Sequence, residues 1–131
     1  MTATSGAFAD LPFSLASRIE KLDGKTSPEE LLAAAHAGCY AMSLAGELAG
    51  NGTPPEHLDV RATVTLDQVA DGSHRIVASE IHARARVDEI DAATLDRLAT
   101  VASEGCPFSK LIEASGTVTV NATLKGATDG D

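Results

Sequence analysis

Two cysteines, Cys39 and Cys106, are the residues of this chain best suited to chemistry. A thiolate is a strong nucleophile and a metal ligand, so a cysteine pair can attack a substrate, form a reversible disulfide or bind a metal. Cys39 lies in the middle of an apolar helical segment, where a cysteine often serves as a small buried hydrophobe. Cys106 precedes Pro107 at a helix start, and it has two interpretations there: a structural N-cap residue or a reactive thiol. Free backbone N–H groups there favour the thiolate, so local sequence alone indicates Cys106 as the more acidic sulfur.

Activation of Cys39 requires a cation from elsewhere in the chain. Cys39 lies more than two turns from the start of its helix, and the helix dipole fades within one turn. The cations that precede the helix are Arg18, Lys21 and Lys25. We favour Arg18, because a guanidinium keeps its charge when it loses water. A solvated charge on a strand is the alternative role for Arg18, and a first-turn acid that complements the helix dipole is the alternative for Glu29.

A histidine also lies near the first thiol. His36 is one turn before Cys39 and has two interpretations, a base or a hydrogen-bonded, partly buried residue. Zinc could take the two cysteines together with histidines. The chain has neither a CxxC nor an HxxxH spacing, so we expect no metal.

The helix that carries Cys39 has the clearest start in the sequence. Ser27 is suited to the N-cap, Pro28 to the first helical position and Glu30 to a capping box. The helix should continue to residues 50–52 (GNG). Its sides are apolar nearly all round and rich in alanine and glycine, which predicts a central helix that is buried on most sides. One chain of this size can barely cover such a helix, and this favours a dimer.

The remaining elements follow from apolar periodicity and turn residues. Alternating residues predict strands over 60–66 and 81–87, joined by a turn at 71–73, and a last strand over 117–124. A further short strand is expected over 13–20, before a turn at 23–25. In the last strand we expect the inward side chains to be Val118, Val120, Ala122 and Leu124.

Two more helices complete the expected domain. One begins after Asp91 and ends at Gly105, and a short one begins after Cys106 and runs through Ile112. The order of elements predicts a single α+β domain over residues 1–131, with segregated antiparallel strands and a central helix. The tail 126–131 should be loose.

Composition excludes several classes of partner. The net charge is −9 and the sequence pI is about 4.7, and this acidity opposes binding to nucleic acid or anionic lipid. No apolar stretch is long enough to span a membrane, and the first ten residues lack the features of a signal peptide. We therefore expect a cytoplasmic protein, whose thiols are kept reduced. Aromatic residues make up only 3% of the chain, so the core has few large aromatic side chains.

Two segments resemble the signature motifs of a known family. Residues 26–39 (TSPEELLAAAHAGC) and 105–110 (GCPFSK) are similar to the two cysteine motifs of the osmotically inducible protein C (OsmC) and organic hydroperoxide resistance family. With Arg18 in residues 17–20 (SRIE), the match covers nearly the whole chain. The sequence of residues 35–37 (AHA) is more similar to the OsmC branch of this family than to the organic hydroperoxide resistance branch. The region before Arg18 is shorter than in typical members.

This resemblance implies an intertwined homodimer with active sites at the subunit interface. It implies a peroxidatic role for Cys39, a resolving role for Cys106, an activating role for Arg18 and an orienting role for Glu29. The implied function is that of a cysteine-based peroxidase that reduces organic hydroperoxides in oxidative and osmotic stress defence, needs no cofactor, and is re-reduced by a lipoyl-type dithiol. Alternatives on the same fold are a non-enzymatic thiol-disulfide sensor, and a structural dimer whose cysteines never react.

Overall fold

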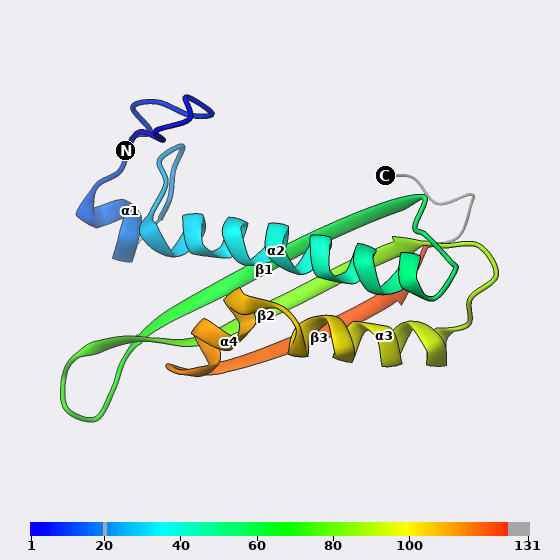
Figure 1. Cartoon of the computed structure of the whole chain (residues 1–131). Coiled ribbons are helices and arrows are strands. Elements are labelled where there is room, and N and C mark those ends of the chain that lie inside the picture. The colour runs from blue at the N-terminus through cyan, green and yellow to red at the C-terminus, as the bar shows by residue number, and fades with distance from the viewer. Residues whose placement is uncertain (20, 126–131) are drawn as a thin grey trace.

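A three-stranded sheet with helices packed along it forms the body of the protein (Figure 1). The computed structural model describes residues 1–19 and 21–125; the predicted loose tail lies outside this range. The elements in chain order are α1 (Leu15–Ile19), α2 (Pro28–Gly50), β1 (His57–Gln68), β2 (His74–Arg86), α3 (Ala92–Glu104), α4 (Pro107–Glu113) and β3 (Thr117–Leu124). The α+β class expected from the sequence is confirmed.

The sheet is mixed, so the prediction of purely antiparallel strands is wrong. β1 and β2 form the expected antiparallel hairpin, whereas β3 runs parallel to β2. The connection from β2 to β3 contains both α3 and α4, and a crossover of this length returns the chain to the same end of the sheet. The strand order is β1-β2-β3.

The inner face of the sheet follows the predicted alternation. In β2, Ile81, Ala83 and Ala85 are buried, and the residues between them are exposed or only half-buried. Leu124, which was expected to point inward, is exposed at 37%. It is the last residue of β3, an edge strand with a neighbour on one side only.

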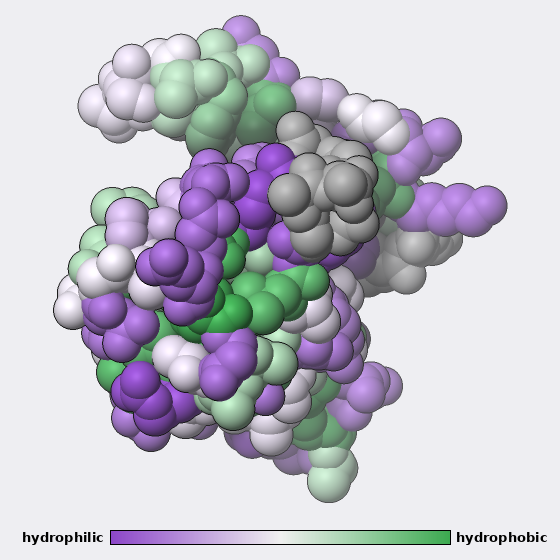
Figure 2. All heavy atoms as spheres, turned by 90° about the vertical axis from the view of Figure 1, so that its right-hand side faces the viewer, coloured by the Kyte–Doolittle hydropathy of each residue, from purple (hydrophilic) through white to green (hydrophobic). Residues whose placement is uncertain are grey.

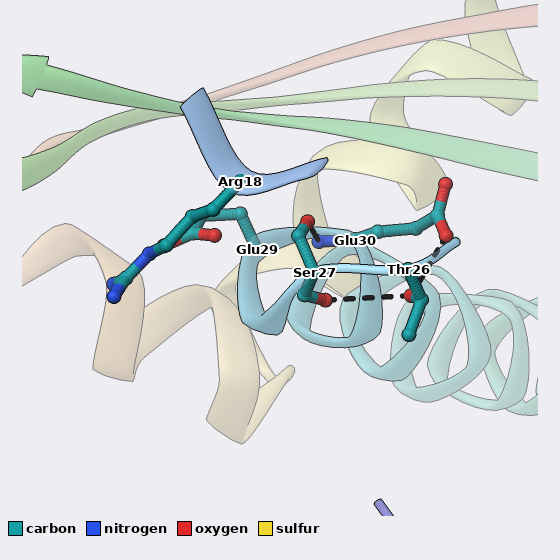
Figure 3. Close-up of polar contacts among 5 residues, drawn as sticks. All are labelled: Arg18, Thr26, Ser27, Glu29 and Glu30. Carbon is teal, nitrogen blue, oxygen red and sulfur yellow. Dashed lines mark hydrogen bonds and ion pairs between the residues drawn. The ribbon is translucent and has the colours of Figure 1, made fainter. Parts of the chain in front are cut away.

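The long helix α2 begins as the sequence predicts. Ser27 has extended backbone angles, and its Oγ accepts a hydrogen bond from the Glu30 N–H at 3.1 Å. The Glu30 carboxylate accepts a hydrogen bond from the Thr26 hydroxyl at 2.8 Å, one residue before the backbone N–H that a capping box would use. These contacts fix the first turn of α2 beside the loop that precedes it (Figure 3).

One face of α2 is buried and the other is not. The buried side chains pack on the sheet and on α3, and they are Ala33, His36, Tyr40, Leu44 and Leu48. The exposed face is made of small apolar residues together with Met42, whose exposure is 79%. Within one chain the helix is therefore covered on one side only, contrary to the prediction that it is buried on most sides. The reason is that the chain supplies one layer of strands to cover it.

The strand expected over residues 13–20 is absent, and the described part of this segment holds helix α1. Ser14 and Ser17 cap each other at its start: the Ser17 N–H donates to Ser14 Oγ at 3.0 Å, and the Ser14 N–H donates to Ser17 Oγ at 2.8 Å. This reciprocal pair satisfies two N–H groups that a short helix otherwise leaves free, which favours helix over strand. Phe13 and Thr26 form one isolated parallel bridge.

Across the described range, no helix has both the length and the apolar character that crossing a bilayer requires.

Candidate functional site

The structure brings the two thiols together. The Sγ atoms of Cys39 and Cys106 lie 3.4 Å apart, although the residues are 67 positions apart in sequence. Two hydrogen bonds fix α2 against α3, whose end leads directly into Cys106: the Tyr40 hydroxyl donates to the Ala99 carbonyl at 3.0 Å, and the Ser43 hydroxyl donates to the Ala102 carbonyl at 2.8 Å. The thiol pair therefore depends on the packing of α2 against the β2–β3 connection.

The two thiols differ in accessibility. Cys106 is fully buried, and Cys39 is only partly buried. An external molecule can therefore reach Cys39 directly, whereas Cys106 is shielded by the protein.

The two thiols also differ in acidity, and here the buried one is the more acidic. Burial raises the pKa of Cys39, and its hydrogen bond with Cys106 raises it further. Burial also opposes ionisation of Cys106, but the neighbouring hydroxyl and backbone of Ser109, the Cys39 thiol and the backbone of Phe108 outweigh it, so the pKa of Cys106 is lowered. Within one chain the more accessible thiol is thus the less acidic one.

Arg18 and Glu29 form a second cluster (Figure 3). Glu29 Oε1 accepts a hydrogen bond from Arg18 Nε at 2.9 Å and lies 2.8 Å from Arg18 Nη2 in an ion pair. Glu29 Oε2 is buried and has no hydrogen-bond partner in the described part of the chain. This pair therefore joins α1 to the first turn of α2 and orients the guanidinium from one carboxylate oxygen.

The cation–carboxylate pair is far from the thiols in the same chain. Glu29 and Cys39 lie ten positions apart on one continuous helix, which corresponds to about 15 Å of rise. Arg18 and Glu29 line a hollow of about 520 Å³ bounded on its other side by residues 62–66 of β1. The four residues predicted for the site thus form two separate pairs.

His36 is a buried, doubly hydrogen-bonded residue. Its Nδ1 lies 2.7 Å from Ser79 Oγ on β2, and its Nε2 lies 2.8 Å from Ser109 Oγ on α4. Burial lowers the pKa of His36, so the neutral ring is favoured. Of the two roles considered from the sequence, the structure shows the hydrogen-bonded one, away from solvent.

Sequence reasoning missed Ser79 and Ser109. Ser79 occupies an inward position of β2, in line with Ile81, Ala83 and Ala85. A polar residue at such a position signals a buried hydrogen-bond partner, but only the fold reveals that the partner is His36. Ser109 stood in the second cysteine motif without an assigned role. Among the residues that the structure describes, no three His, Cys, Asp or Glu side chains gather as a metal site would require.

The fold and the thiol pair define a small α+β redox domain with paired cysteines on a central helix and a crossover connection. The chain belongs to the family described as OsmC-like protein, whose sequence profile matches residues 21–121. It is 35% identical over 125 residues to Peroxiredoxin OsmC of Escherichia coli (strain K12). This alignment covers 95% of this chain and 85% of that protein. The family is thus related to peroxide and redox chemistry.

Solved structures show the same fold. The organic hydroperoxide resistance protein OhrB of Bacillus subtilis aligns with a TM-score of 0.72 at 23% identity, over 95% of this chain and 87% of that one. An organic hydroperoxide resistance protein OsmC from Legionella pneumophila aligns with a TM-score of 0.74 at 22% identity, again over 95% and 87% of the two chains.

Proposed function

We propose that this protein is a thiol-dependent peroxidase that reduces organic hydroperoxides to alcohols, with Cys39 as the attacking sulfur and Cys106 as the resolving one. The observation that carries the proposal is the 3.4 Å separation of the two sulfur atoms. A relative named peroxiredoxin and structural neighbours named for organic hydroperoxide resistance support it.

The reaction follows from the arrangement of the thiols. The Cys39 thiolate attacks the peroxide oxygen, the O–O bond breaks, and the products are a Cys39 sulfenic acid and an alcohol. Cys106 then attacks the sulfenic sulfur, a disulfide forms and water leaves. Two electrons from an external dithiol, which we expect to be of the lipoyl type, return both cysteines to thiols in the cytoplasm. The short distance between the sulfurs lets the second step compete with over-oxidation of Cys39.

Accessibility decides which sulfur attacks. Cys39 is partly exposed and Cys106 is fully buried, so a peroxide in solution meets Cys39 first. Met42 lies one turn after Cys39 and is largely exposed, and Phe108 on α4 packs against the same core cluster as Cys39. An apolar surround of this kind favours an alkyl hydroperoxide over hydrogen peroxide, because it replaces water around an alkyl group.

Activation of Cys39 requires Arg18, and we propose that the arginine comes from a second copy of the chain. Within one chain the Arg18–Glu29 pair lies about 15 Å from Cys39 along α2. Two copies of α2 packed antiparallel would bring the start of one helix beside the middle of the other. The guanidinium would then lower the pKa of Cys39 and stabilise the charge that develops on the peroxide.

The exposed face of α2 supports such a homodimer. Between its first turn and its last residue, the exposed side chains of α2 are small or flexible, which permits close approach of a second helix. They are Ala34, Ala35, Gly38, Met42, Gly46 and Ala49. Figure 2 looks at the end of the molecule toward which α2 runs, and apolar side chains also reach the surface between polar ones there. Burial of this surface would supply the second covering layer that α2 lacks within one chain.

A second candidate function is a non-enzymatic thiol-disulfide sensor. The raised pKa of Cys39 favours it, because a poorly ionised thiol reacts slowly with peroxide. A sensor would form the Cys39–Cys106 disulfide without sustained turnover when a dithiol is supplied.

The test is consumption of cumene hydroperoxide in the presence of dihydrolipoamide by the wild type, Cys39→Ser and Cys106→Ser. We expect repeated turnover by the wild type and none by Cys39→Ser. Cys106→Ser should complete the first oxidation and then accumulate sulfinic acid at Cys39, which mass spectrometry detects. If Cys106→Ser alone abolished the first oxidation step, the two roles would be reversed. A wild type that forms the disulfide but stops after one equivalent would point to the sensor.

A further inference from the structure

The contact between the two sulfur atoms has a neighbouring contact one helical turn away. On α2, His36 comes three residues before Cys39, and on the facing segment Ser109 comes three residues after Cys106. His36 Nε2 lies 2.8 Å from Ser109 Oγ, and Cys39 Sγ lies 3.4 Å from Cys106 Sγ. We propose that His36 is a positioning residue: its hydrogen bond with Ser109 fixes α4 along α2 and thereby holds Cys106 opposite Cys39. This inference rests on the proposed function for its role in the reaction.

The backbone of α4 carries this restraint from Ser109 to Cys106. Cys106 is the N-cap residue of α4, and the Lys110 N–H donates to the Cys106 carbonyl at 3.1 Å. This hydrogen bond closes the first turn of the helix, which contains Ser109. Cys106 and Ser109 are therefore parts of one turn, just as His36 and Cys39 are on α2. A displacement of Ser109 relative to α2 must move Cys106 with it.

The ring of His36 is itself fixed from the sheet. Its Nδ1 lies 2.7 Å from Ser79 Oγ on β2, and His36, Ser79 and Ser109 are all fully buried. A neutral imidazole has one donor and one acceptor nitrogen, and here each nitrogen has a serine hydroxyl as its partner. Rotation of the ring would leave buried polar groups without partners, which is costly. The ring is therefore a fixed bridge that joins β2 and α4 through α2.

Helix α4 depends on such contacts for its position. It has seven residues, and a helix this short is marginally stable on its own. Its buried side chains are Ser109 and Ile112, and Cys106 makes no side-chain hydrogen bond as the N-cap. On the other side of the thiols, the Ser43 hydroxyl donates to the Ala102 carbonyl at 2.8 Å and holds the end of α3 against α2. The hydrogen bond with Ser109 does the same for the start of α4.

The step that this alignment serves is the attack of Cys106 on oxidised Cys39. Cys106 loses its proton and attacks the sulfenic sulfur of Cys39, the S–S bond forms, and the S–O bond breaks. The departing hydroxide takes up the proton that Cys106 lost, so water is the only other product. A misplacement of about 1 Å can slow a reaction between two positioned groups about 100-fold. Attack of Cys39 on the peroxide does not involve Cys106, so loss of the His36 contact should slow the second step and spare the first.

The first test measures the effective concentration of the two thiols in the full-length protein, by equilibration with reduced and oxidised glutathione. Ser109→Ala removes the contact with α4 and should lower the effective concentration about fivefold, the effect of losing one buried hydrogen bond. His36→Leu removes both contacts of the ring and should lower it at least as much. His36→Gln keeps a polar group near the position of Nε2 and should restore most of the wild-type value.

A matched control separates positioning from general stability. Leu48 is fully buried on α2, nine residues after Cys39, and Leu48→Ala should destabilise the protein because it creates a cavity. The effective concentration of the thiols in Leu48→Ala should stay within about twofold of the wild type, because distant sites act independently. A loss in Leu48→Ala as large as in His36→Leu would mean that general destabilisation is the cause, which refutes the proposal.

The second test follows the two oxidation steps separately with cumene hydroperoxide. His36→Leu should form the Cys39 sulfenic acid at the wild-type rate. It should then convert at least about threefold more of this acid to sulfinic acid per oxidation, because resolution is slower. His36→Gln should lie close to the wild type. Equal slowing of both steps in His36→Leu would contradict a role in resolution.

The glutathione measurement uses no peroxide and therefore separates this inference from the proposed function. A protein that fails to reduce hydroperoxide would defeat the proposed function, and the effective concentrations would still decide the positioning role. If His36→Leu does not fold, Ser109→Ala decides it. An unchanged effective concentration in Ser109→Ala, or equal values for Leu and Gln at position 36, would overturn the proposal.

Discussion

The sulfur atoms of Cys39 and Cys106 lie 3.4 Å apart in the reduced protein, whereas a disulfide holds two sulfurs at about 2.05 Å. A shift of about 1.4 Å closes this gap. We therefore expect a mild oxidant such as diamide to form the intramolecular disulfide quickly. The closed loop spans 67 positions, for which the chain-entropy relation gives a stabilisation of at most about 4 kcal/mol. Denaturant unfolding of the oxidised and reduced forms, after non-reducing mass spectrometry, measures this difference. Mainly intermolecular disulfides would contradict it.

Mixed dimers test whether Arg18 acts across the subunit interface. Arg18→Ala and Cys39→Ser should each lose most of the peroxidase activity, Arg18→Ala by a factor of about 100 or more, because the thiolate loses its cation. When the two variants are co-expressed, the mixed dimer joins an intact Cys39 to an intact Arg18 from the other chain. We expect up to half of the wild-type activity per mixed dimer, measured on heterodimers purified with two different tags. Mixed dimers as inactive as their parents would place Arg18 and Cys39 of the same chain in one site.

Gly38 tests the face that the proposed dimer would bury. It lies on the exposed face of α2, where, in the part of the chain that the structure describes, an added Cβ would meet nothing within 4 Å beyond its chain neighbours and the nearby backbone of its own helix. Gly38→Glu should therefore leave the monomer fold intact but bury a charge in a helix–helix contact. We expect a dimer-to-monomer shift in light scattering and a large loss of activity. Thr100→Glu, at an exposed position of α3, is the control. A dimeric Gly38→Glu protein would exclude this face as the interface.

His36 should make stability depend on pH. Burial places its pKa below the ordinary value of 6.5, so between these two values the unfolded chain binds a proton that the native ring does not. The free energy of unfolding then rises with pH in that range and falls as the pH drops below about 6.5. In His36→Gln this part of the dependence should vanish. Denaturant unfolding of both proteins at several pH values measures it, and parallel curves would show that His36 is not the group responsible.

Gly116 is predicted to be essential for the last strand. It stands between α4 and β3, where an added Cβ would overlap the backbone of Val77. Gly116→Ala must push β3 away from β2, and we expect a loss of about 2 kcal/mol or more in the free energy of unfolding. Gly105→Ala, whose added Cβ would meet its nearest atom at 3.5 Å, is the matched control and should cost less. Equal free energies of unfolding for the two variants would mean that β2 and β3 can move apart at position 116 at little energetic cost.

Local patterns in the sequence predict the elements that depend on local physics. The Ser27 cap, the apolar length of α2, the alternation in β2 and the Asp91 cap of α3 all appear in the structure. Helix α1 was missed because its start depends on a reciprocal serine pair that resembles an ordinary polar stretch. The parallel pairing of β2 with β3 was missed because it depends on where a long connection returns, which periodicity does not record.

The candidate site shows the same difference between what local sequence predicts and what only the tertiary structure shows. The sequence motifs identify Cys39, Cys106, Arg18 and Glu29, but the distances among them are tertiary facts. The fold joins the thiols with each other and the arginine with the glutamate. Ser79 and Ser109 had no distinctive spacing, since a serine becomes informative only when its burial and its partner are known.

The parallel crossover that carries Cys106 ties redox competence to complete folding. Cys39 belongs to a helix that can form from local contacts, but Cys106 reaches it only when α3 and α4 have crossed from β2 to β3. Contacts so distant in sequence form late, because loop closure must come first. An incompletely folded chain would thus expose a lone nucleophile without its resolving partner. The rate at which the two thiols become cross-linkable during refolding should report the formation of the last parallel strand.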